Sequence, residues 1–197
     1  MASILDSGFL TGQGLVLVEG ETGSAQTIYA LSVAADALAG GRKVVFITHG
    51  LREDVVRILE GFGIRGTERM EIFGEVADWR GVAVPDGGLA VLDSLPFFTG
   101  GETSGGMRNT LSEMIRASRP GKTILLLSEM GILPRAQEQL ARAMADGVIQ
   151  FLAEREGEKI RRYIHVLKMR GSLPIDRLIP FTLAHEGIKI DPRERYG

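Results

Sequence analysis

Cysteine is absent from the 197-residue chain, which excludes disulfide bonds and thiolate metal sites. Neither sign of charge dominates, since there are 23 basic and 25 acidic side chains and the net charge is −2. This balance gives no general electrostatic attraction to nucleic acid or to an acidic membrane surface. Histidine is also rare, and His49, His165 and His185 lack the spacing of a metal-binding pair.

Long apolar runs are absent too, and none approaches the roughly 18 residues that a membrane span needs. The first residues, MASILDSGFLTG, lack the basic start and the long apolar centre of a signal peptide. We therefore expect a cytoplasmic protein. With 44% hydrophobic residues the chain can bury one core. We expect a single domain over 1–197, with a lead-in at 1–13 and a flexible tail at 191–197.

Strand and helix patterns alternate along the chain. Apolar, β-rich runs at 15–18, 43–48, 88–92 and 122–128 alternate with helical patterns at 28–39, 51–61, 107–117 and 134–145, and a short strand is expected at 69–73. Alternation of this kind predicts an α/β fold with a mainly parallel sheet and helices on both faces. Two C-terminal antiparallel hairpins are expected, joining 148–152 to 160–168 and 181–183 to 188–190.

The segment LVLVEGETGSAQT, residues 15–27, is the most informative stretch. A strand, a glycine-bearing loop and a helix form the setting of a phosphate-binding loop, whose pattern is G-x-x-x-x-G-K-S/T. Gly20 and Thr27 occupy the first and last positions of that pattern. Ala25 replaces the second glycine and Gln26 replaces the lysine. A plain tight connection remains the alternative. If position 25 needs a positive φ, the Cβ of Ala25 costs about 1–2 kcal/mol.

Asp93 is the second chemical signal, because it closes the apolar run LAVLD. In nucleotide-hydrolysing sheets such an aspartate holds Mg²⁺, and its strand is expected to lie beside the loop strand. The alternative is a strand-terminal residue that caps a turn. Glu129, after the run at 122–128, is expected to be a loop residue rather than a polar sensor.

These segments together resemble a known family. VLVEGETGSAQT, KVVFIT, LAVLDSL, KTILLLSEM, ADGVIQFLAEREGEKIRRYIHVLKMRGS and IPFTLAHEGIKI are similar, in order, to the RecA-like domain of the KaiC-like ATPases. These proteins are widespread in archaea and include RadA-type recombinase paralogues. The resemblance implies a RecA-like P-loop NTPase fold with a degenerate Walker A motif.

The resemblance also implies roles for particular residues. Nucleotide is expected at Gly20, Gly23, Ser24, Gln26, Thr27 and Asp93, with Thr27 and Asp93 as the Mg²⁺ side. In the family, a K-x-R-G-S/T element reaches the nucleotide of a neighbouring subunit, and Lys168 and Arg170 match it. An edge strand with solvated basic residues is the alternative. The family's water-activating glutamate is replaced here by Thr48-His49-Gly50, where His49 is either a substitute base or a surface residue.

Three functional hypotheses follow. The first is a regulatory or scaffold pseudo-ATPase, self-associated or paired with an active paralogue, that binds ATP and Mg²⁺ weakly or not at all. The second is an oligomeric, weakly hydrolysing ATPase that takes a cation from a neighbour. The third is a recombination accessory protein that contacts DNA through a flexible stretch bracketed by Gly100-Gly101 and Gly105-Gly106, although Arg108 and Phe97-Phe98 give only a thin basic footprint.

Overall fold

The computed structural model describes residues 7–171, 176–185 and 187–190. The helices are α1 (Ser7–Leu10), α2 (Gln26–Ala39), α3 (Arg52–Gly61), α4 (Leu95–Phe98), α5 (Ser104–Ala117) and α6 (Arg135–Met144), with a 3-10 turn at Trp79–Gly81. The strands are β1 (Gly14–Gly20), β2 (Val44–Thr48), β3 (Glu71–Phe73), β4 (Leu89–Asp93), β5 (Thr123–Glu129), β6 (Gly147–Glu156), β7 (Lys159–Met169), β8 (Ile179–Ala184) and β9 (Gly187–Ile190). No helix in these ranges is long and apolar enough to cross a membrane.

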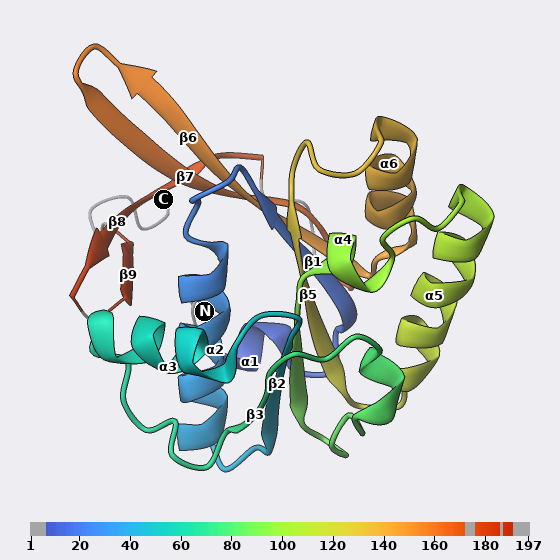
Figure 1. The fold of residues 1–197 in the computed structure, drawn as a ribbon. Helices are drawn as coiled ribbons and strands as arrows, with labels where there is room; N and C mark the ends of the chain where they lie inside the picture. The colour runs from blue at the N-terminus through green and yellow to red at the C-terminus, as the bar shows by residue number, and fades with distance from the viewer. Residues whose placement is uncertain (1–6, 172–175, 186, 191–197) are drawn as a thin grey trace.

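One sheet runs through the described part of the chain, in the strand order β3-β2-β4-β5-β1-β6-β7-β8-β9. The strands from β3 to β6 are parallel, and β7, β8 and β9 add to the β6 side in antiparallel sense. The α/β fold class is therefore confirmed, including the parallel centre and both C-terminal hairpins. The first hairpin is long, and its tip extends well beyond the rest of the sheet (Figure 1).

Helices cover both faces of the sheet (Figure 1). On β1, Val16 and Val18 pack into the cluster formed with α1, α2 and α3. Leu15 and Leu17 point the other way, into the cluster formed with α4, α5 and α6. A strand buried on both faces is expected to be mostly apolar, which explains why the run at 15–18 has no polar alternation. The two clusters hold β1 at the centre of the sheet, and the loop that follows β1 begins at the sheet edge.

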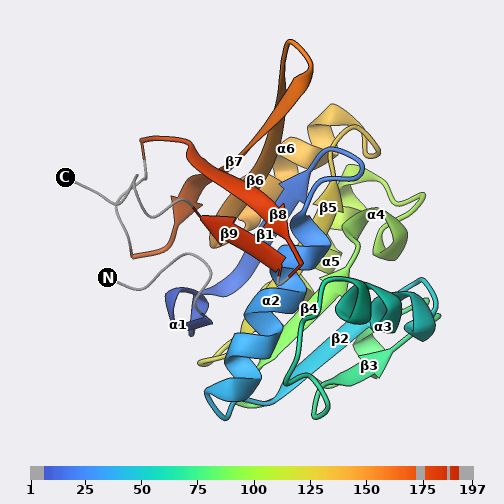
Figure 2. The same cartoon turned by 90° about the vertical axis from the view of Figure 1, so that its left-hand side faces the viewer.

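The β8–β9 hairpin returns to the α2 face of the sheet and lies beside that helix (Figure 2). Ile188 is buried in the same cluster as α2, and a Cβ on Gly187 would lie 2.8 Å from Ser32 Oγ. The C-terminal strands therefore continue the same sheet and pack against α2 rather than forming a separate unit. The expected tail at 191–197 lies outside the described residues.

Two expectations about local structure were wrong, and two short helices were missed. Gly105 and Gly106 lie in the first turn of α5, whose N-cap Thr103 accepts a hydrogen bond from the Gly106 N–H, so they do not close a flexible stretch. The short helices α1 and α4 were missed, because four residues are too few to show a helical period. Glu129 is the last residue of β5 rather than a loop residue.

Candidate functional site

The carboxyl ends of β1, β5 and β4 meet at one edge of the sheet. Gly20 pairs with Glu129 at the end of β5, and the Met130 N–H donates to the Gly20 carbonyl at 2.9 Å. Asp93 ends β4, which pairs with β5 on its other side. The expectation that the Asp93 strand lies directly beside the loop strand was wrong, because β5 separates them. All three residues still share the edge at which parallel sheets bind ligands.

The loop after β1 is compact. The Ser24 N–H donates to the Glu21 carbonyl at 2.8 Å, and Gly23 in this turn has φ 77°, a conformation that glycine adopts without a Cβ penalty. Gly20 has no room for a side chain, since a Cβ would overlap Ser24 Oγ and lie 2.5 Å from Gln26 Oε1. The glycines at positions 20 and 23 are thus required by the loop's own geometry.

Gln26 fills the space beside Gly20. Its side chain is buried, and its Oε1 accepts a hydrogen bond from Ser24 Oγ at 2.7 Å. The residue in the lysine position therefore brings a neutral amide that is already bonded within the loop. Ala25 has φ −82°, so the penalty expected for a positive φ does not arise. The departure that matters chemically is at position 26.

Thr27 lies in the first turn of α2 and is partly buried. Its pairing with Asp93 around Mg²⁺ stays a prediction. In the described ranges, no group of three or more His, Cys, Asp and Glu side chains is arranged to hold a metal ion. The backbone of the loop has the geometry to hold a phosphate, but the loop has no cation. The residues present therefore fit ATP and Mg²⁺ only in part.

Asp93 is largely buried, and this desolvation raises the pKa of its carboxyl group to about 6. The nearby His49 lowers the pKa of Asp93, whereas the Glu129 carboxylate raises it. The His49 ring stacks on Phe97 of α4 at a centroid distance of 3.3 Å, and its Nδ1 lies 3.3 Å from the Asp93 carbonyl oxygen. The structure thus brings His49, Asp93 and Glu129 together at the sheet edge.

The raised pKa of Asp93 predicts a pH-dependent stability effect. The folded-state pKa of about 6 lies above the unfolded value, so Asp93 stabilises the fold below about pH 4 and loses that contribution as the pH rises through 6. We expect Asp93→Asn to increase the free energy of unfolding by about 2 kcal/mol at pH 7.5 and by little at pH 4. Urea denaturation at the two pH values measures this, and an equal effect at both would contradict it.

A buried carboxylate next to the loop was missed by the sequence reasoning. Glu19, the residue before Gly20, accepts hydrogen bonds at 2.7 Å from Arg142 Nε of α6 and from Gln150 Nε2 of β6. Its side chain is 3% exposed. The available signal was one acidic residue inside an otherwise apolar buried strand. The ion pair ties α6 to the end of the strand that carries the loop.

Lys168 and Arg170 lie at the opposite end of the sheet from the loop. Lys168 Nζ donates to the Ala143 carbonyl at 3.1 Å, and Arg170 is 3.5 Å from the Asp146 carboxylate. Neighbouring pairs place this end of β7 level with Val16 of β1, four residues before Gly20. Neither cation can serve the loop of its own chain, and their action on a neighbouring subunit stays a prediction.

The strand order, the helices on both faces and the loop at the carboxyl edge define a RecA-like ATPase domain. The family model described as "ATPase: KaiC" matches residues 87–195, more than half of the sequence. The chain therefore belongs to the KaiC ATPase family. The match includes Asp93, Lys168 and Arg170, and the loop at 20–27 lies before it. Comparison with the curated proteins gives no match.

Proposed function

We propose that this KaiC-family chain does not hydrolyse ATP and acts as a regulatory or scaffold subunit. The observation that supports this most strongly is the Gln26 side chain, which is buried and bonded to Ser24 within the loop. Phosphoryl transfer depends on positioned positive charge around the transferring group. A neutral amide in the lysine position removes that charge where it is needed most.

The environment of His49 supports the same proposal. Its ring stacks on Phe97, and its Nδ1 lies close to the Asp93 carbonyl. A general base must place a free acceptor against the attacking water. With the His49 ring stacked on Phe97 and its Nδ1 beside the Asp93 carbonyl, only Nε2 is left to act as the acceptor of a base. The site therefore has neither the loop cation nor the glutamate that the family uses to activate water.

The partner in this proposal is an active KaiC-like paralogue or further copies of the same chain. The described sheet and C-terminal hairpins are those of a RecA-like domain, which supports assembly with a related chain. In this proposal, a bound nucleotide regulates the protein and is not hydrolysed. DNA contact stays a weaker hypothesis, because two of the four glycines in the stretch invoked for it are helical.

The test is ATP turnover by the purified chain with Mg²⁺. We expect a rate at the level of the buffer background, unchanged by Asp93→Ala, because the missing lysine already prevents the chemistry. Released phosphate is measured over hours, with an active P-loop ATPase as the positive control. Turnover well above background that disappears in the Asp93→Ala variant would refute the proposal.

The placement of Lys168 and Arg170 favours a second candidate, a weakly hydrolysing oligomer that completes each site with a neighbour's cations. Both residues lie at the sheet end remote from their own loop, which supports a role toward a neighbouring copy. This candidate requires assembly, together with hydrolysis that is lost in Lys168→Ala or Arg170→Ala. Mass measurement on separated species decides it, and a monomer at working concentration excludes it.

A further inference from the structure

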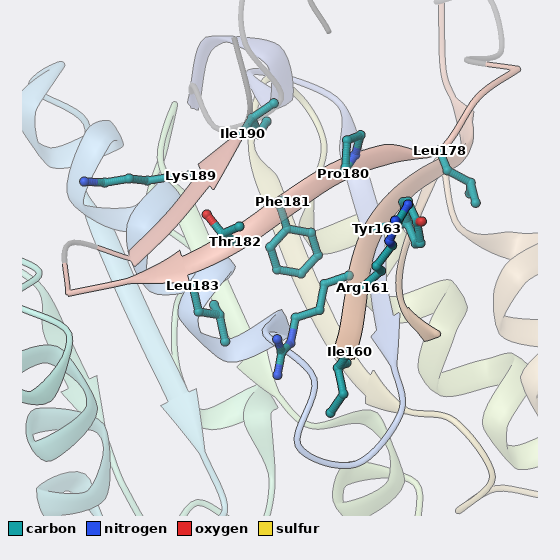
Figure 3. Close-up of a pocket in the computed structure, with 11 residues that line it drawn as sticks. Ile160, Arg161, Tyr163, Leu178, Pro180, Phe181, Thr182, Leu183, Lys189 and Ile190 are labelled. Atoms are coloured by element: carbon teal, nitrogen blue, oxygen red, sulfur yellow. The ribbon is translucent and has the colours of Figure 1, made fainter. Parts of the chain in front are cut away.

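A cavity of about 170 Å³ opens between the loop after β1 and the C-terminal strands. Residues 21–25 form one wall, and side chains from β6, β7 and β8 form the other. Ile160, Arg162 and Phe181 also line a larger, open cavity of about 880 Å³ on β7, β8 and β9, shown in Figure 3. These three residues belong to the walls of both cavities, which together we call the hollow beside the loop.

Arg162 lies where this hollow meets the loop. Phe151 of β6 pairs with Gly20 on one side and with Ile164 on the other, and Arg162 is two residues from Ile164 along β7. Residues two apart on a strand share a face, and Ile164 is buried in the cluster that contains α2. Arg162 therefore sits just beyond the carboxyl end of β1, on the face of the sheet that carries the loop and α2.

The Arg162 side chain is half-buried, and within the described ranges it makes no hydrogen bond or ion pair. The neighbouring Arg161, in contrast, is exposed and paired with Glu156. In the facing wall, the backbone N–H groups of Thr22 and Gly23 also have no partner among the described residues. Glu21 is the acidic residue of this wall, and it is exposed to solvent. Donors from both walls, namely the Arg162 guanidinium and the solvent-exposed N–H groups of Thr22 and Gly23, thus line the smaller cavity.

We propose that Arg162 supplies, from the sheet side, the positive charge that the loop lacks at Gln26. The ligand is a nucleoside phosphate whose phosphate group lies between residues 21–25 and the Arg162 guanidinium. Arginine suits this position because its planar fork stays charged and donates two parallel hydrogen bonds to phosphate. The larger cavity, with Tyr163, Pro180 and Phe181 among its walls, accommodates the nucleoside (Figure 3).

The inference rests on the proposed function only in placing nucleotide at this loop. Binding is measured separately from ATP turnover, so that the two proposals can fail independently. The experiment is calorimetric titration of the full chain with ADP, with pyrophosphate and with adenosine. We expect Arg162→Met to weaken ADP binding about tenfold to a hundredfold, the loss of a charge-assisted contact. Arg162→Lys is expected to restore part of it. Adenosine has no phosphate, so its affinity should be equal for wild type and Arg162→Met.

Arg155→Met is the matched control, because Arg155 belongs to the same hairpin, lines neither cavity and donates to the Gly157 carbonyl. It should change ADP affinity less than twofold. If pyrophosphate binds in an Arg162-dependent way and ADP does not bind, the phosphate site is supported. The ligand is then one without a nucleoside. Equal ADP affinity in wild type and Arg162→Met, or no binding of ADP or pyrophosphate by wild type, would overturn the inference. Unchanged thermal melting establishes that the variants are folded.

Discussion

Gln26→Lys is expected to raise the affinity for Mg²⁺-ATP about tenfold to a hundredfold. The substitution puts an ammonium group at the one loop position where the phosphate-binding pattern requires a cation. A charge-assisted hydrogen bond contributes about 1.5–3 kcal/mol, which sets the size of the expected gain. Titration with a fluorescent ATP analogue measures it directly.

Gln26→Met is the control, because it has a similar length without a charge and also removes the bond from Ser24. Any gain that came only from freeing the loop would appear in both variants. Since Ala25 has φ −82°, adding Ala25→Gly to Gln26→Lys should bring no further gain in affinity. Equal affinities for the lysine and methionine variants would mean that this loop does not face a phosphate.

Arg142→Met is expected to lower the free energy of unfolding by about 3 kcal/mol. The substitution leaves the Glu19 carboxylate, 3% exposed, without its cation, although Gln150 still donates to it. Removing one partner of a buried ion pair costs about 3–5 kcal/mol, because the remaining charge stays desolvated. Urea denaturation at neutral pH gives the value.

Two further variants give this prediction its controls. Arg119→Met removes from Asp146 an arginine that is 49% exposed, and Asp146 keeps Arg170 and the Leu15 N–H as partners, so it should cost less than about 1 kcal/mol. The double variant Glu19→Gln with Arg142→Met removes the buried charge and should recover most of the lost stability. A loss in Arg142→Met no greater than that in Arg119→Met would show that Glu19 is not dependent on this pair.

Much of the fold was predictable, because the signals were local and repeated. The run at 15–18 has no polar alternation since both of its faces are buried, and α2 ends at Ala39, the last residue of the expected helical pattern. Strand order was harder to predict. Nothing in the residues of β4 specifies that β5 lies between it and β1, because that order depends on contacts between segments far apart in the chain.

The candidate site divides in the same way. Gly20, Gln26 and Asp93 were found because a linear pattern fixes their spacing. Glu19 and Arg162 were not, since each gains its meaning from a partner or a wall that is distant in sequence. Glu19 meets Arg142 more than a hundred positions later, and Arg162 faces the loop only through the pairing of β6 with both β1 and β7. A linear sequence pattern does not predict contacts between residues so far apart in the chain.

The position of β5 between β1 and β4 has a consequence for ligand length. Adjacent strands lie about 4.8 Å apart, so the ends of β1 and β4 are separated by about 10 Å at the sheet edge. A single phosphate at the Gly20 loop is too short to reach Asp93, and the Glu129 carboxylate at the end of β5 stands between them. Only an extended ligand, such as a chain of phosphates with a hydrated cation at its far end, spans both. The strand order therefore sets a minimum length for a ligand that contacts both the Gly20 loop and Asp93.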